Sequence, residues 1–249
     1  MRANYGIDAP GLVRMFIITA IMMLLISTFF LYLSATQEWA RWVAIPIFVL
    51  ALYPLGMFCL MIWGSLITKV KDRETILNLI TWRGDERVLD IGCGRGLMMI
   101  GAARRLTTGH ATGIDIWAAK DQSQNSENAA LQNAKIEGVE NRVSVQTADM
   151  RHLPFADQSF DVVVSNWVVH NLDDIKDRQK TLSETLRVLK PNGKILLTDI
   201  VNREEYLAEL KTRGCKEIKL VVFAPLKDKL LKLVSFGSFA PATIVASKT

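Results

Sequence analysis

Two long stretches without a charged residue, 15–37 and 42–68, occupy the first third of this 249-residue chain. A helix that rises ~1.5 Å per residue needs about 20 mainly apolar residues to cross a hydrocarbon core ~30 Å thick. Both stretches meet this requirement, and only residues 38–41 separate them. We therefore predict a hairpin of two transmembrane helices, at about 12–36 and 42–68, within a membrane anchor spanning residues 1–72.

Two other origins of such stretches are open. A core helix of a soluble domain is also apolar, although two adjacent runs of this length are unusual there. A cleaved signal peptide would have a basic residue such as Arg14 before its apolar core and small residues such as Ser34 and Ala35 after it. The second stretch would remain after such a cleavage.

Basic residues flank the predicted hairpin at its outer ends: Arg2, Arg14, Lys69, Lys71 and Arg73. The connecting loop carries one Glu and one Arg. Because the cytoplasmic flanks of membrane helices are enriched in Lys and Arg, we expect a multi-pass protein with both termini and the remaining domain in the cytoplasm.

Charge outside the hairpin is nearly balanced, since the segment through Arg73 holds six basic and three acidic residues of the 30 and 25 in the chain. A nucleic-acid-binding domain would instead present a basic face, so nucleic acid is not an expected partner. Cys59, Cys93 and Cys215 lack the spacing of a metal site or a disulfide framework. We expect reduced thiols and no metal.

From residue 87 onward, short apolar runs alternate with longer amphipathic ones, which predicts an α/β fold with a doubly wound, mostly parallel sheet over residues 73–249. The expected strands are 87–91, 111–115, 143–147, 161–165 and 194–199, with helices at 97–106, 126–137 and 175–189. Two later runs, 218–223 and 242–246, fit a final antiparallel pair.

A glycine-rich turn, Gly92, Gly94 and Gly96, follows the first expected strand, whose end carries Asp90. Glycine permits positive φ and close approach of a ligand, and the helix that follows offers unpaired amides. The dinucleotide fingerprint G-x-G-x-x-G would place its third glycine one residue later, where Leu97 stands. The turn therefore indicates a nucleotide-like ligand and disfavours a dehydrogenase.

Two further acids follow the next strands. Asp115 ends the second strand about 20 residues after the turn, where a carboxylate can accept ribose hydroxyls, and Asp149 follows the third. Carboxyl ends of parallel strands form the ligand crevice of open α/β sheets, so these acids are expected to converge. Three unrelated solvated turn acids are the alternative.

Five blocks in this order resemble the class I S-adenosylmethionine-dependent methyltransferases, and among them the ubiquinone/menaquinone-biosynthesis group. The blocks are 89–96 (LDIGCGRG), 113–115 (GID), 149 with 153–155 (D and LPF), 159–163 (SFDVV) and 186–193 (LRVLKPNG). The resemblance covers about residues 87–200. It implies a Rossmann-like, seven-stranded sheet whose last strand is antiparallel, here preceded by the transmembrane hairpin.

The resemblance also implies S-adenosylmethionine as cofactor and gives binding roles to residues at the strand ends: Asp90, Gly92, Gly94, Gly96, Asp115, Ile116, Asp149, Met150 and Asn166. Asp90 and the glycines would contact the methionine portion. Asp115 would hold the ribose, and Asp149 would accept from the adenine amino group. Asn192 stands where the family often has glycine, and asparagine can adopt the same left-handed conformation.

Methyl transfer needs an in-line nucleophile, so much of the acceleration can come from positioning. A hydroxyl acceptor would also need a base, and His170, after the fourth strand, is the candidate catalytic residue; a purely structural histidine is the alternative. The anchor favours a small, hydrophobic or membrane-associated acceptor. Residues 226–239 mix Lys and Leu as an interfacial helix does, or as ordinary amphipathic packing does.

Two rival functions are open: a catalytically silent cofactor-binding partner of a membrane complex, and a nucleotide-cofactor oxidoreductase. The intact acids Asp90, Asp115 and Asp149 disfavour the first. The position of the third glycine disfavours the second.

Overall fold

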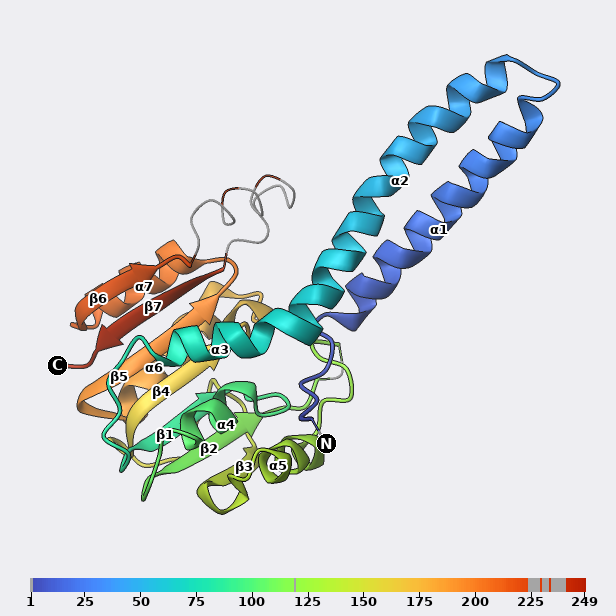
Figure 1. Ribbon diagram of the computed structural model, residues 1–249. Helices are drawn as coiled ribbons and strands as arrows, with labels where there is room; N and C mark the ends of the chain where they lie inside the picture. Colours follow the sequence, from blue (N-terminus) through green and yellow to red (C-terminus); the bar gives the residue numbers. More distant parts are fainter. Residues whose placement is uncertain (1, 119, 224–228, 230–232, 234–240) are drawn as a thin grey trace. The chain divides into compact units, whose positions relative to one another are not determined.

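The computed structural model describes residues 2–118, 120–223, 229, 233 and 241–249 (Figure 1). The chain forms two compact units. We call them the hairpin unit, Gly6–Lys69 with Ala118–Gln124, and the sheet unit, Met1–Tyr5, Val70–Trp117 and Asn125–Thr249. The chain therefore passes between the units four times, twice in the loop that follows the second strand.

The hairpin unit consists mainly of two helices that pack side by side, α1 (Pro10–Leu33) and α2 (Trp39–Trp63), the second continuing into η1 (Gly64–Thr68) (Figure 1). Both are long and apolar enough to cross a membrane, by length and composition. They overlap the two predicted ranges, and each begins slightly earlier. Small side chains lie buried between them, and the Ser27 hydroxyl donates to the Ala44 carbonyl at 2.9 Å.

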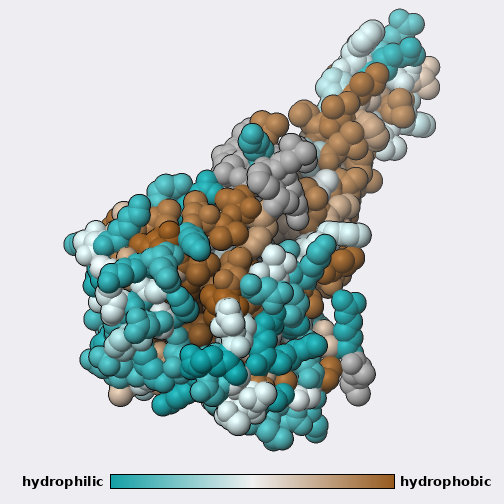
Figure 2. All heavy atoms as spheres, turned by 60° about the vertical axis from the view of Figure 1, so that its left-hand side comes forward, coloured by the Kyte–Doolittle hydropathy of each residue, from teal (hydrophilic) through white to brown (hydrophobic). Residues whose placement is uncertain are grey.

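The large apolar side chains of the hairpin point outward. Figure 2 shows hydrophobic residues on the hairpin surface, whereas the visible surface of the sheet unit is mostly hydrophilic. Only 11% of the most apolar window of each helix is buried. The pattern of burial is therefore the reverse of that in a helix of a soluble core.

The base of the hairpin unit is closed by polar contacts around Asp8. The Lys69 ammonium lies 2.9 Å from Asp8 Oδ1 and donates to the Gly6 carbonyl, and the Asp8 amide donates to Ser65 Oγ at 3.1 Å. Lys69 is buried as a result. A basic residue that the sequence presents as a membrane flank is thus neutralised within the protein.

Arg73 of the sheet unit is also buried and paired within the protein. Its buried guanidinium lies 2.7 Å from Glu74 and donates to the Tyr5 hydroxyl at 3.0 Å. The positive-inside argument for orientation therefore depends on the other three flanking basic residues.

The described residues of the sheet unit form a seven-stranded sheet in the order β3-β2-β1-β4-β5-β7-β6 (Figure 1). Its first five strands are parallel, and β7 pairs antiparallel with both β5 and β6, which confirms the predicted topology. The strands are β1 (Arg87–Ile91), β2 (His110–Asp115), β3 (Val143–Thr147), β4 (Phe160–Asn166), β5 (Leu189–Asp199), β6 (Lys216–Val221) and β7 (Ala242–Ser247).

Helices cover both faces of this sheet, which confirms the doubly wound arrangement. The helices are α3 (Lys69–Leu77), α4 (Leu97–Ala103), α5 (Glu127–Ile136), α6 (Ile175–Val188) and α7 (Arg203–Thr212), with short turns η2 (Glu140–Arg142) and η3 (Val169–Asn171). Alternate strand residues point to opposite faces. Val88 packs in one core with α3, α4 and α5, and its neighbour Leu89 packs in the other with α6 and α7.

The clearest differences from the sequence prediction lie in α4, α7 and β5. Helix α4 ends at Ala103 rather than at 106, and α7 was not predicted. Helix α6 ends at Val188, and β5 begins at Leu189 rather than at 194. The Lys248 ammonium donates to the Leu186 and Leu189 carbonyls at this junction. Asn192 has a φ of 61°, the predicted left-handed conformation. The expected interfacial helix at 226–239 lies outside the described residues.

Candidate functional site

The carboxyl ends of the parallel strands bring most predicted site residues to one edge of the sheet. Asp115, Asn166 and Asp199 are the last residues of β2, β4 and β5. The glycine turn follows β1 and Asp149 follows β3 (Figure 1). This edge is where ligands bind in open α/β sheets.

The glycine turn is folded against the end of β2. Gly92 and Cys93 both donate their amides to the Ile114 carbonyl at 2.9 Å. Gly92 has a φ of 69°, and a Cβ at this position would collide with the Val168 side chain. Gly96, with a φ of 84°, begins α4 in the left-handed conformation. The two positions therefore require glycine, because their conformations have positive φ and because side chains of the protein occupy the space of a Cβ.

Asp90 lies under this turn and is 1% exposed. Its Oδ2 accepts from the Met99 amide at 2.8 Å. Burial, assisted by the nearby charge of Asp115, raises the pKa of Asp90 to about 7. A cationic group on a ligand would favour the charged carboxylate at neutral pH.

Asp115 gathers three donors at the edge. Its Oδ2 accepts from the Gly94 amide at 2.8 Å, and its Oδ1 accepts from the Trp117 amide at 2.6 Å and from Asn125 Nδ2 at 3.3 Å. Asn125 Oδ1 is buried and has no hydrogen-bond partner in the described part of the chain. A carboxylate beside an orphaned amide oxygen fits the hydroxyls of a ribose, and the exposed side chain of Ile116 fits the face of a base.

Asp149 has a partner that the sequence did not reveal. Arg151 Nε lies 3.0 Å from both carboxylate oxygens and Nη2 lies 2.6 Å from Oδ2, while Nη1 reaches Asp177 of α6 at 2.7 Å. This guanidinium holds the pKa of Asp149 below its usual value. A role toward adenine would therefore be shared with Arg151. Met150, the next residue, packs partly buried against the core on the α6 side.

A second polar cluster at this edge is built around His170 of η3. Its Nδ1 lies 2.5 Å from Asp199 Oδ1, and its amide donates to Asp199 Oδ2 at 3.1 Å. The Asp199 side chain is 2% exposed and that of His170 is 21% exposed. A carboxylate at Nδ1 selects the tautomer whose Nε2 is a proton acceptor.

The network behind His170 extends to α7. The Tyr206 hydroxyl donates to Asp199 Oδ2 at 3.2 Å, and burial together with the charge of Asp199 raises the Tyr206 pKa. Sequence reasoning missed Asp199. Its signal was present, since Asp199 is an acid at the end of a strand, as Asp115 is. Asn166 is half-buried at the end of β4.

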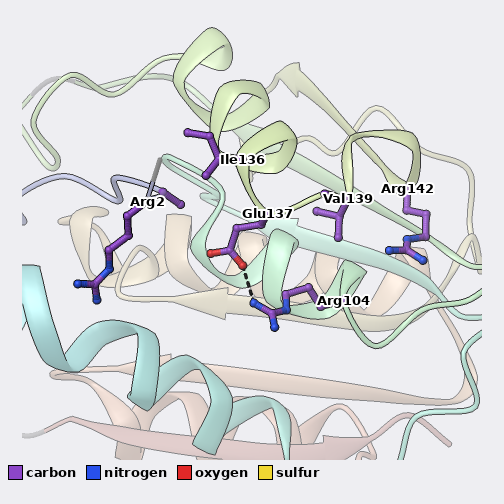
Figure 3. Close-up of a pocket in the computed structure, with 8 residues that line it drawn as sticks. Arg2, Arg104, Ile136, Glu137, Val139 and Arg142 are labelled. Atoms are coloured by element: carbon purple, nitrogen blue, oxygen red, sulfur yellow. Dashed lines mark hydrogen bonds and ion pairs between the residues drawn. The ribbon is translucent and has the colours of Figure 1, made fainter.

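A broad depression of about 560 Å³ lies at the opposite end of the strands (Figure 3). It is bordered by the segments that follow α4 and α5. Arg104 lies 2.8 Å from Glu137, and Arg142 donates to the Leu106 carbonyl. These arginines are engaged within the protein, and the depression is separate from the edge that carries the acids. No group of three potential metal ligands occurs among the described residues.

Comparison with known proteins gives consistent results. A family model described as a methyltransferase domain matches residues 83–237. The chain is 38% identical over 117 residues to methyltransferase GfsG of Streptomyces halstedii, covering 47% of this chain and 38% of that protein. It is 30% identical over 134 residues to demethylmenaquinone methyltransferase of Lactobacillus johnsonii, covering 53% and 50%. The chain thus spans half or less of the length of these relatives.

Among solved structures, geranyl diphosphate C-methyltransferase from Streptomyces coelicolor, in complex with S-adenosyl-L-homocysteine, aligns with a TM-score of 0.60. The identity is 18%, and the alignment covers 76% of this chain and 82% of that chain. At this identity the likeness concerns the fold alone.

Proposed function

Because this chain belongs to the S-adenosylmethionine-dependent methyltransferases, we propose that it is a membrane-anchored member that methylates a small, hydrophobic or membrane-associated acceptor. The observation that carries the proposal is the exposed apolar surface of α1 and α2, of whose most apolar windows only 11% is buried. A soluble core helix would bury such side chains, and water would disfavour their exposure over two whole helices. A lipid bilayer accommodates them.

The proposal assigns residues 1–72 to the anchor and residues 73–249 to a cytoplasmic catalytic domain. The flanking basic residues Arg2, Arg14 and Lys71 support this orientation. Cys93 and Cys215 are free thiols, which is usual for a domain in a reducing compartment.

The cofactor, when bound, supplies a methyl group carried on a sulfonium. The proposal gives the binding roles to the residues at the strand ends. Asp90 and the turn glycines would hold the methionine portion, and Asp115 with Asn125 would hold the ribose hydroxyls. The adenine would lie between the Ile116 side chain and the loop of Asp149 and Met150, with Asn166 near the reacting end.

His170 is proposed as the general base for a hydroxyl acceptor. Its Nε2 would take the hydroxyl proton, and the buried Asp199 carboxylate would stabilise the imidazolium that forms. In other His-Asp pairs the carboxylate likewise orients the imidazole ring and stays unprotonated. A relative whose name specifies demethylmenaquinone supports a hydrophobic ring compound as the acceptor class.

The first test is calorimetric titration of the detergent-solubilised full-length protein with S-adenosylmethionine, S-adenosylhomocysteine and a dinucleotide. We expect binding of the first two, strongly weakened in Asp115→Ala. Binding of the dinucleotide alone would favour an oxidoreductase instead.

The second test follows transfer of a labelled methyl group to membrane extracts and to soluble extracts. We expect the label in lipid-extractable products. Labelling of water-soluble compounds alone would refute the membrane acceptor, and cofactor binding without any transfer would favour a silent binding partner.

A further inference from the structure

The glycine turn is supported by residues that precede the first helix. Arg95, within the turn, donates from Nε to the Asn4 carbonyl at 2.7 Å. Asn133 of α5 joins the two, since its Nδ2 donates to the Asn4 and Arg95 carbonyls at 2.9 and 3.0 Å and its Oδ1 accepts from the Asn4 amide. Arg95 and Asn133 are both buried. Asn4 is therefore part of the hydrogen-bond network that supports the glycine turn.

The loop after β2, which we call the second cofactor loop, comprises the described residues 116–118 and 120–125. Hydrogen bonds to Asp115 and to the segment before α1 hold it in place. Trp117 and Asn125, near its two ends, both donate to Asp115 Oδ1. Its middle belongs to the hairpin unit and pairs with the residues just before α1. Ser123 donates its amide to the Ile7 carbonyl at 3.0 Å, and its Oγ accepts from the Ile7 amide at 2.8 Å. The Ala9 amide donates to the Asp121 carbonyl at 2.9 Å.

Residues 4–9, which we call the N-terminal strap, thus take part in the support of both cofactor loops. The strap is fixed at the base of the hairpin, where Asp8 pairs with Lys69. It is fixed in the sheet unit through Tyr5, whose hydroxyl donates to Glu137 at 2.7 Å and accepts from Arg73. Its last residue, Ala9, immediately precedes Pro10, the first residue of α1.

We infer that the N-terminal strap sets cofactor affinity by supporting the glycine turn and the second cofactor loop, with Ser123 and Asn133 as the positioning residues. This inference rests on the proposed function. While the strap bonds are intact, they hold both loops in the arrangement that presents Asp115. When these bonds are lost, the loops must be ordered by the cofactor itself, and this ordering lowers affinity.

The test compares Ser123→Ala with Ser123→Thr in the full-length protein reconstituted in lipid nanodiscs. Ala removes the hydroxyl that accepts from Ile7, whereas Thr retains it. We expect the Kd for S-adenosylhomocysteine to rise about fivefold to tenfold in Ser123→Ala, as for the loss of one partly buried hydrogen bond, and to remain near wild type in Ser123→Thr. KM for S-adenosylmethionine should rise with it, with little change in kcat.

Ser159→Ala serves as the matched control, because Ser159 Oγ also bonds a backbone group, the Ala156 carbonyl, in a turn that contacts neither the strap nor the glycine turn. Its Kd should not change. A general loss of folded protein would lower the number of binding sites without altering Kd, so calorimetry distinguishes it from a positioning role.

Coupling is reciprocal, so the cofactor must also stabilise the strap. Hydrogen exchange should slow at the Ile7 and Ala9 amides when S-adenosylhomocysteine is added to the nanodisc-bound protein. An unchanged Kd in Ser123→Ala together with unchanged exchange would overturn the coupling while leaving the methyltransferase assignment intact. Absence of cofactor binding by the wild type would overturn the proposed function and the coupling with it.

Discussion

The hairpin unit and the sheet unit distribute the same kinds of side chain in opposite ways. In the hairpin, alanines such as Ala20 and Ala44 are buried, and leucines such as Leu25 are exposed. In the sheet unit, leucines such as Leu196 are buried, and hydrophilic residues cover most of the surface visible in Figure 2. Because a folded chain places large apolar groups away from water, the difference is what the proposed placement of the hairpin in lipid requires.

The proposed function divides the work between the two units. It places methyl transfer at the strand edge of the sheet unit and assigns membrane attachment to the hairpin. Substitutions on the outer face of α1 should therefore change membrane retention, and substitutions at the strand edge should change turnover.

The largest effect is expected at His170. His170→Ala should lower kcat by about 10²- to 10⁴-fold for a hydroxyl acceptor, because alanine has no group that can accept the hydroxyl proton. Retention in membranes and cofactor affinity should remain as in the wild type. Turnover with an extract or a purified acceptor gives the measurement, and unchanged turnover would leave His170 a structural residue.

The second prediction compares the effect on stability of truncating a buried leucine and an exposed one. Leu196→Ala, in the fully buried centre of β5, should lower the free energy of unfolding by about 2–5 kcal/mol through lost burial and a cavity. Leu25→Ala, at a side chain that is 65% exposed, should change the unfolding of the sheet unit by less than about 0.5 kcal/mol. Thermal unfolding in detergent measures both. Equal losses would mean that the two units do not differ as described.

A third prediction compares the effect of a new charge in the hairpin unit with that of a new charge in the sheet unit. Leu25→Arg, near the middle of α1, should oppose membrane insertion by about 2.5–3.5 kcal/mol. Ile136→Arg, at a partly exposed position in the sheet unit, serves as the control and should have little effect. The fraction of protein that resists alkaline extraction from membranes is the readout. If both variants stayed in the membrane equally, lipid contact along α1 would be refuted.

The elements that local patterns define were predictable. Strand β1, the turn at Gly92 and the acid at Asp115 follow from periodicity, glycine conformation and chain order, and they lie where these rules place them. Helix α7 was missed because half of its ten residues are charged and only Tyr206 and Leu210 are buried. Such a pattern is hard to distinguish from a polar loop.

Partners that are distant in the sequence were not predictable. Asn4 and Asn133 are 129 positions apart, and nothing local marks them as a pair. Lys69 was assigned to the membrane flank from its position, but its partner Asp8 lies on the far side of the whole hairpin in sequence. The same holds for Asp199 beside His170. Local rules thus place strands and turns, whereas side-chain partners depend on the packed fold.

The smallest effect concerns pH and the acid under the glycine turn. In the cofactor-free protein, burial raises the pKa of Asp90 to about 7, above its value in the unfolded chain. Between about pH 4 and 7 the folded state therefore holds a proton that the unfolded state has lost, and the free energy of unfolding falls as pH rises through this window.

Cofactor affinity should move in the opposite direction, because the ammonium group of the cofactor favours the charged carboxylate. Affinity for S-adenosylhomocysteine should rise about tenfold from pH 6 to pH 8, with release of up to one proton on binding near pH 6. Asp90→Asn should bind more weakly and lose this slope. Calorimetry in buffers of different ionisation enthalpy measures the proton release directly. A slope that persisted in Asp90→Asn would assign the titration to another group and leave the buried acid with a purely structural role in the sheet unit.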